Sequence, residues 1–425
     1  MGGTPVGYFC EQNMMTNNQN MTLNRITLMF PLALVLFEFS VYIGNDLIQP
    51  AMLSITEQFA VSATWAPSSM SFYLLGGASV AWLLGPLSDR LGRKKVLLAG
   101  VAFFTLCCLL ILLTHNIEQF LTLRFLQGMG LSVISAVGYA AIQETFEERD
   151  AIKVMALMAN ISLLAPLLGP VLGAFLIDYV SWHWGFVAIA AVSFISWFGL
   201  KKFMPSTQES RKQPKQPFSH IFDDFKKVFS NRRFLGLSIA LPMVGMPLML
   251  WIALSPIILV DELKLSSVQY GLAQFPVFFG LIAGNIILIK IIDRFPLGKT
   301  ILLGLPIMLL GTLFLVLGVI WQAYLVPCLL IGMTLISLGE GISFSVMYRF
   351  ALMSSEVSKG TVAAAVSMLM MISYFVVIEL VRVLYTHFHI WAFALASVVL
   401  IVLWFSSPRH TLKQHMQARE QQGIH

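Results

Sequence analysis

Charged residues are scarce in this sequence of 425 residues: Asp, Glu, Lys and Arg make up only 11% of it, whereas 57% is hydrophobic. A soluble domain cannot hide so much apolar surface, because even large soluble folds keep a polar exterior. The short alternating segments of outer-membrane barrels are also lacking, and long apolar runs stand in their place. The composition therefore predicts an all-α protein that spans the lipid bilayer.

Cysteine and histidine are also few, with four and eight residues, and neither shows the spacing of a metal site. Cys107, Cys108 and Cys328 lie in apolar runs, where a small core residue is the favoured interpretation, and Cys10 lies in a polar stretch. No disulfide framework, metal site or other cofactor is predicted.

A nucleotide-binding loop is lacking as well. Gly298-Lys299-Thr300 looks like the end of a P-loop, but the glycine required five residues before Gly298 is Asp293. No ATPase domain and no sizeable soluble domain is visible elsewhere, which argues against a sensor or receptor with an output domain. The chain is not expected to be an enzyme.

Twelve apolar runs are present, and each membrane crossing needs about 20 such residues. Six runs precede a polar stretch and six follow it, at about 26–48, 68–88, 96–114, 117–141, 152–177, 184–203, 234–260, 268–292, 300–319, 322–348, 360–384 and 388–406. The predicted organisation is a tail over 1–24, a six-helix bundle over 25–203, a basic linker over 204–233, a second bundle over 234–406 and a tail over 407–425.

The net charge of +6 is unevenly distributed. Basic residues gather in the linker, the tail after the last run and two of the loops, whereas the opposite loops hold almost none except Lys264. The positive-inside rule then places both termini in the cytoplasm. The basic excess is a topology signal, so no nucleic-acid partner is expected. The loop residues concerned are Arg90, Arg93, Lys94, Lys95, Lys290, Arg294 and Lys299.

The loop between the second and third runs carries the clearest motif. Gly85 permits close helix approach, Gly92 permits a tight turn, and Asp89 can pair with arginines. An ordinary basic loop is the alternative, but a degenerate copy at Asp293-Arg294 about 200 residues later indicates an internal repeat of two halves. The motif reads Gly85-Pro-Leu-Ser-Asp89-Arg90-Leu-Gly92-Arg93-Lys94-Lys95.

This motif resembles the signature loop of the major facilitator superfamily, and three further strings narrow the resemblance. One is the helix-4 arginine motif, one looks like the proline- and glycine-rich antiporter motif of helix 5, and the helix-1 string looks like the twelve-helix drug:proton antiporter branch. The strings are Arg124-Phe-Leu-Gln127-Gly128, Ala165-Pro166-Leu-Leu-Gly169-Pro170-Val-Leu-Gly173 and Leu36-Phe-Glu38-Phe-Ser-Val-Tyr42-Ile-Gly-Asn45-Asp46-Leu-Ile-Gln49-Pro50.

Carboxylates inside the apolar runs are functional candidates by default, because the bilayer tolerates them poorly. Glu38 lies near the middle of the first run, and Asp46 lies two helical turns further on, so both can face one cavity. The alternative for Asp46 is a permanent structural pair with Arg124. Glu340 in the tenth run is either functional or a buried hydrogen-bonded acid.

Glu379 and Arg382 are three residues apart in the eleventh run. Side chains at this spacing on a helix can pair. A structural ion pair is the favoured interpretation.

The resemblance implies an all-α major facilitator fold with two six-helix bundles around a central cavity. It also implies a monomer of the bacterial inner membrane that exports lipophilic drugs, chloramphenicol among them, in exchange for protons. Asp46, Glu38, Arg124 and Glu340 are the expected proton-coupling residues. The expected drug pocket contains Tyr42, Asn45, Asp46, Met70, Leu131, Ile252 and Phe278. The expected conformational switch contains Gly85, Asp89, Arg90, Gly92, Arg93, Pro166, Gly169, Pro170 and Gly173.

Two rivals remain from the sequence. A channel needs a continuous pore and no coupling carboxylates. A proton-coupled transporter of an endogenous metabolite, whether importer or exporter, would share the fold, although the antiporter motif is usually absent from importers.

Overall fold

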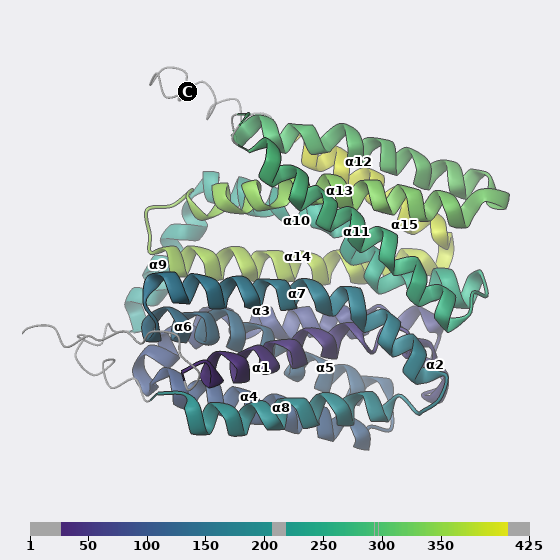
Figure 1. Cartoon of the computed structure of the whole chain (residues 1–425). Helices are drawn as coiled ribbons and strands as arrows, with labels where there is room; N and C mark the ends of the chain where they lie inside the picture. The colour runs from purple at the N-terminus through teal and green to yellow at the C-terminus, as the bar shows by residue number, and fades with distance from the viewer. Residues whose placement is uncertain (1–26, 206–217, 293, 296, 407–425) are drawn as a thin grey trace, which may run out of the picture.

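The computed structural model describes residues 27–205, 218–292, 294–295 and 297–406. Its long helices run side by side along a common direction (Figure 1). The first half contains α1 (Met29–Asp46), α2 (Met52–Gln58), α3 (Ser68–Leu91), α4 (Arg93–Leu110), α5 (Ile117–Ser132), α6 (Tyr139–Thr145), α7 (Glu148–Ile177) and α8 (His183–Phe203). After α9 (Phe218–Ser230), the second half contains α10 (Arg232–Ser255), α11 (Ser267–Ile291), α12 (Leu297–Ile320), α13 (Leu325–Leu352), α14 (Lys359–Phe388) and α15 (Ile390–Ser406).

Every one of the twelve predicted apolar runs coincides with helix. Ten helical stretches in the described ranges are long and apolar enough to cross a membrane. The two other runs lie in α7 and α15, which contain the apolar stretches Leu164–Ile177 and Ile390–Phe405. One crossing joins α5 to α6 through a π-helical segment, Val133–Gly138, and another extends α10 through a second, Pro256–Glu262. The all-helical membrane class predicted from composition is confirmed.

Two helices were not expected from the apolar runs, because both are too short to span a bilayer. One is α2, and the other is α9, which lies within the predicted linker. Phe229 of α9 stands edge-on to Phe234 of α10, with ring centroids 6.0 Å apart. Between them, Asn231 caps α10 by accepting from the backbone N–H groups of Arg233 and Phe234. The chain therefore enters the second half through an ordered, capped turn.

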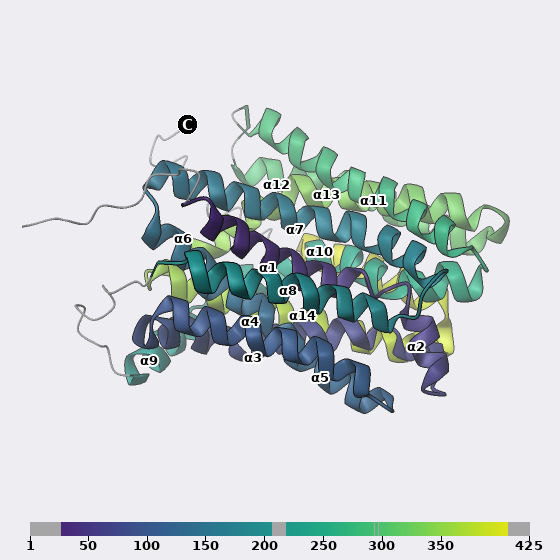
Figure 2. The ribbon, with the colours of Figure 1, turned by 60° about the horizontal axis from the view of Figure 1, so that its bottom comes forward.

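Two seams join the halves: α3 lies against α14, and α7 lies against α11. Figure 2 shows the same ribbon from another side, with α7 of the first half alongside the α11–α13 layer of the second. At the first seam, Phe72 and Phe375 meet edge to face at 5.6 Å. At the second, a Cβ added to Gly271 would lie only 3.1 Å from the Val171 Cα.

Glycines set the closest approach within the first half. A Cβ on Gly128 of α5 would lie 1.8 Å from the Tyr73 carbonyl oxygen of α3, and one on Gly76 would lie 1.8 Å from that of Phe125. Small residues at such contacts let membrane helices pack backbone against backbone. The glycine of the helix-4 motif is therefore needed for α3 and α5 to meet.

We expect Gly128→Ala to lower the thermal stability of the purified protein, because the added methyl group must push two backbones apart. Overpacking of this kind costs roughly 1–3 kcal/mol or more. Gly236→Ala in α10 is the matched control, since a Cβ there meets nothing within 4 Å. Thermal unfolding curves measured in detergent should shift to lower temperature for Gly128→Ala only. Equal curves for the two variants would contradict the packing argument.

Candidate functional site

One face of α1 carries a stripe of polar side chains. Glu38, Tyr42 and Asp46 follow at intervals of four residues, which places them above one another on the helix. Glu38 is fully buried, Asp46 is 4% exposed, and Tyr42 is half-buried. The predicted common orientation of the two carboxylates is consistent with this spacing.

Asp46 is connected to Arg124 through an amide. The Asn45 Nδ2 group donates to Asp46 Oδ1 over 3.0 Å, and Asn45 Oδ1 accepts from Arg124 Nη2 over 3.1 Å. No direct ion pair joins the two charged groups in the part of the chain that the structure describes. The sequence placed these residues together correctly, but the direct pair considered as the alternative is not formed.

Arg124 of α5 is completely buried and held from several directions. Its Nε donates to the Ser69 hydroxyl over 3.0 Å, and its Nη1 donates to the Gly44 carbonyl over 3.1 Å and also to Gln127. The guanidinium carbon lies 4.5 Å from the centre of the Tyr73 ring. A buried guanidinium needs such partners, because an unpaired charge in an apolar interior is very unfavourable. Arg124 therefore ties α5 to α1 and α3.

Glu38 has one partner and one free oxygen. Its Oε1 accepts from the Tyr139 hydroxyl over 2.9 Å, while Oε2 is buried without a hydrogen-bond partner in the described structure. Tyr139 was not predicted, because a tyrosine within an apolar run gives no sequence signal. An unsatisfied buried acceptor is rare in proteins and marks a group that can take another partner.

Glu340 of α13 lies in the second half and is 6% exposed. Its Oε2 also lacks a hydrogen-bond partner among the described residues. A Cβ on Gly245 of α10 would lie 3.1 Å from Glu340 Oε1 and 2.7 Å from the Tyr374 hydroxyl, so the acid faces α10 and α14. Glu340 is thus buried in the second half, close to α10 and α14.

Apolar pocket residues come from both halves. Met70 and Leu131 lie in the first half, Ile252 and Phe278 lie in the second, and all four are at most 9% exposed. They belong to one continuous apolar core, and Tyr42 packs against it.

The helix-5 motif lies between this stripe and the second half. Added Cβ atoms on Gly169 and Gly173 would lie 2.6 Å from the Asp46 Cβ and 2.1 Å from the Leu47 carbonyl oxygen. The turn that holds Pro170 faces Gly271 of α11 on the other side. Both Pro166 and Pro170 lie inside α7. The small residues of the motif therefore allow α7 to contact α1 at Asp46 and Leu47.

An apolar cavity of about 350 Å³ lies between α7 and α11, on the side where Phe275 and Phe279 are exposed. Its lining consists of Leu167, Phe275, Pro276, Phe279 and Ile282. Such a lining suits a lipophilic molecule.

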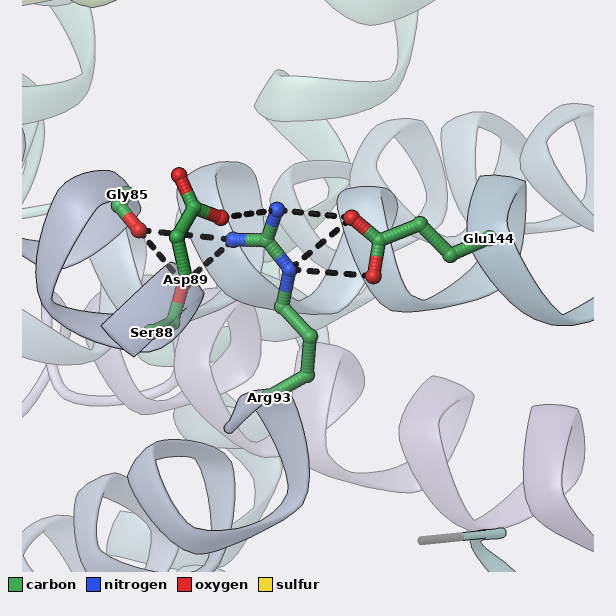
Figure 3. A network of polar contacts seen from close by, with 5 residues as sticks. All are labelled: Gly85, Ser88, Asp89, Arg93 and Glu144. Carbon is green, nitrogen blue, oxygen red and sulfur yellow. Dashed lines mark hydrogen bonds and ion pairs between the residues drawn. The ribbon is translucent and has the colours of Figure 1, made fainter. Parts of the chain in front are cut away.

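The loop motif forms a polar network around Arg93 (Figure 3). Arg93 pairs with Asp89 and with Glu144, the latter at 2.7 Å, and it also contacts Ser88. The Arg93 side chain is only 10% exposed, whereas Asp89 and Glu144 are 58% and 42% exposed. Arg93 therefore links the end of α3 to the end of α6.

Two glycines shape this network. Gly92 has φ of +95°, a conformation that side chains other than glycine rarely adopt. The Gly85 carbonyl oxygen accepts from Arg93 Nη1 over 3.4 Å. Arg90 lies in the last turn of α3. Glu144 was missed from the sequence, because it follows an apolar run as one ordinary surface acid among several.

The remaining predictions concern an ion pair in the eleventh run, the degenerate copy of the loop motif and metal ligands. The pair Glu379–Arg382 is confirmed at 2.7 Å. Asp293 of the degenerate loop copy lies outside the described residues. Among the described residues, no group of three or more His, Cys, Asp or Glu side chains is arranged to hold a metal ion.

Comparison with known proteins agrees with the sequence motifs. The family model described as Major Facilitator Superfamily matches residues 34–378. The chain is 80% identical over 412 residues to the chloramphenicol resistance protein CraA of Acinetobacter baumannii, covering 97% of this chain and 99% of that protein. It is 44% identical over 407 residues to the multidrug transporter MdfA of Escherichia coli O157:H7, covering 94% and 98%.

Solved structures agree on the fold. A D-xylose-proton symporter matches with a TM-score of 0.68 at 17% identity, over 90% of this chain and 97% of that one. The predicted resemblance is confirmed by the family match and by relatives that span nearly the whole chain. The chain is a multi-pass protein of the bacterial inner membrane and belongs to the major facilitator superfamily.

Proposed function

We propose that the chain exports lipophilic drugs, chloramphenicol among them, in exchange for protons, by alternating access between its two halves. The observation that carries the proposal is the buried Asp46, which is linked through Asn45 to Arg124 and contacted by Gly169 of α7. The identity to a chloramphenicol resistance protein and to multidrug transporters supports the substrate class.

Proton uptake at Asp46 would change the direction of its hydrogen bonds. A carboxylate only accepts, whereas a protonated carboxyl group also donates. Asn45 now donates to Asp46 and accepts from Arg124. A proton on the Asp46 Oδ1 atom that faces Asn45 would oppose that arrangement. The amide would then rotate, and Arg124 would lose an acceptor. Proton binding at Asp46 would thereby change the contacts between α5 and α1 and allow α5 to move relative to α1.

The drug is proposed to lie in the apolar core between the halves, next to this stripe. Glu38 offers a negative charge with one unpaired oxygen, which suits lipophilic cations. Neutral chloramphenicol needs no such charge. Glu340, also with an unpaired oxygen, is proposed as a second proton-accepting residue in the other half.

We propose, from the positive-inside rule, that the end of the bundle that carries Arg93 and the linker faces the cytoplasm and that the α2 end faces outward. The Arg93 network is proposed to hold the cytoplasmic ends of α3 and α6 together in one state and to rearrange in the other. The protein is proposed to work as a monomer with the two bundles and linker described above.

Expression of the chain in a host that lacks its own drug pumps should raise the inhibitory concentration of chloramphenicol several-fold. An uncoupler that removes the proton gradient should abolish the reduced drug accumulation. A channel would instead give flux that does not saturate. Unchanged inhibitory concentrations across a broad drug panel, with the protein present in the membrane, would refute the drug assignment and favour a metabolite as the substrate.

Asp46→Asn should abolish the proton release that follows drug addition to the purified protein in weakly buffered solution. An amide fills the same space but cannot carry the proton. Glu38→Gln is the matched comparison, and it should reduce release less while still allowing chloramphenicol to bind. A pH electrode or indicator dye measures the release. If the Asp46→Asn protein released as many protons as the wild type, Asp46 would not be the coupling site, and Glu340 would be the next candidate.

Arg93→Ala should lower transport turnover at least tenfold while leaving drug affinity within about twofold, because Arg93 lies in the loop network and not in the apolar core. The size follows from losing charge-assisted hydrogen bonds worth about 1.5–3 kcal/mol. Lys95→Ala, an exposed neighbour in the same loop, is the matched control. A large loss of affinity with normal turnover would contradict the switch assignment.

A further inference from the structure

We propose that Ser71, Glu379, Arg382 and Trp65 form a polar latch that closes the α2 end of the transport path, so that these residues set how often the site opens there. The proposal rests on alternating access between the halves, part of the proposed function, and does not depend on which carboxylate carries the proton.

The latch crosses the seam between α3 and α14. The Ser71 hydroxyl of α3 donates to Glu379 Oε1 of α14 over 2.5 Å. Glu379 Oε2 accepts from Arg382 Nε over 2.7 Å. One carboxylate therefore holds its own helix through one oxygen and the opposite half through the other.

Arg382 reaches the opposite half as well. Its guanidinium carbon lies 4.4 Å from the centre of the Trp65 ring, in the short helical turn Ala63–Trp65 that precedes α3. A cation over an aromatic face is attracted to it, and more strongly where water is excluded. The pair Glu379–Arg382 is thus more than a contact within α14, because each partner contacts the first half.

Burial makes these contacts strong. The side chains of Arg382 and Glu379 are only 15% and 19% exposed. Hydrogen bonds to an ionised group are roughly twice as strong as neutral ones. Separating α3 from α14 at this end would strip both Glu379 and Arg382 of their partners across the seam. The latch therefore favours the state that is closed at the α2 end.

The other seam has a weaker counterpart. The Ser267 hydroxyl, at the start of α11, donates to Asp178 Oδ1, at the end of α7, over 2.8 Å. This bond is solvent-exposed and has no cation beside it in the described contacts. Water can replace it when the seam opens, so its loss should matter little. It supplies a matched control, since both bonds join a serine hydroxyl to a carboxylate across a seam.

The latch is also close to the polar cluster of α1. Ser69, which accepts from Arg124, precedes Ser71 by two residues in the first turn of α3. Any shift of that turn moves the Arg124 contact and the Glu379 contact together. The end that the latch closes is therefore connected to the proposed coupling site by one helical turn.

Spin labels at Glu57→Cys in α2 and Ala323→Cys between α12 and α13 report the opening of this end. Both positions are exposed, and they belong to different halves. The labels are placed in the full-length chain with its native cysteines replaced. Double electron–electron resonance then gives the ratio of long to short distances between the two labels. It is measured for the variants Ser71→Ala, Ser71→Thr, Glu379→Gln and Ser267→Ala.

Ser71→Ala and Glu379→Gln should each raise the ratio of long to short distances about tenfold, the effect of losing one charge-assisted hydrogen bond. Ser71→Thr keeps the hydroxyl and should retain the wild-type ratio, and Ser267→Ala should stay within about twofold of it. A merely structural role would lower the yield of folded protein without changing the ratio. If the Glu379→Gln protein does not fold, the comparison of Ser71→Ala with Ser71→Thr tests the latch.

An unchanged ratio in Ser71→Ala would overturn the latch. An equal increase in Ser267→Ala would do the same, since it would mean that any cross-seam bond matters. Neither result bears on proton release by Asp46→Asn, so the latch and the coupling site fail independently.

Discussion

A guanidinium in an apolar interior must be surrounded by acceptors, and Arg124 shows how much of the structure this constraint fixes. Its side chain is fully buried, and its donors reach α1, α3 and its own helix. Taking such a charge out of water costs several kcal/mol unless hydrogen bonds compensate. The positions and rotations of α1, α3 and α5 around Arg124 are therefore fixed by these hydrogen bonds. If one acceptor moves, Arg124 must keep its hydrogen bonds to the remaining acceptors.

The same constraint explains why glycines and polar groups occur together. The polar contacts of α1 need α7 nearby to exclude water, and Gly169 removes the side chain that would prevent it. On its far side α7 meets α11 at Gly271, so the same helix contacts both Asp46 and a seam between the halves. Close packing makes the arrangement stiff, because a shift of a few tenths of an ångström cannot be absorbed by rotating side chains.

Much of this could be predicted from the sequence, and the reasons are physical. The twelve runs follow from bilayer thickness, and Glu38, Asp46 and Arg124 stand out because charges inside such runs are rare. What could not be predicted involves residues whose types are ordinary. Tyr139 reads as one more aromatic in an apolar run, and Glu144 as a surface acid. The pair Glu379–Arg382 was predicted from its spacing, but its contacts across the seam depend on tertiary packing that spacing cannot give.

The amide between Asp46 and Arg124 is the feature that best suits a transporter. A direct buried ion pair would be strongly favoured over either separated charge, and breaking one typically costs 3–5 kcal/mol. A site that changes its hydrogen bonds in every transport cycle needs a smaller difference in free energy between its two states. Asn45 provides one, because its amide can donate to the Asp46 carboxylate or accept from the protonated Asp46 carboxyl group. Rotating the amide costs Arg124 one acceptor but leaves its bonds to Ser69, Gly44 and Gln127. The two arrangements can therefore lie close in free energy while differing in geometry.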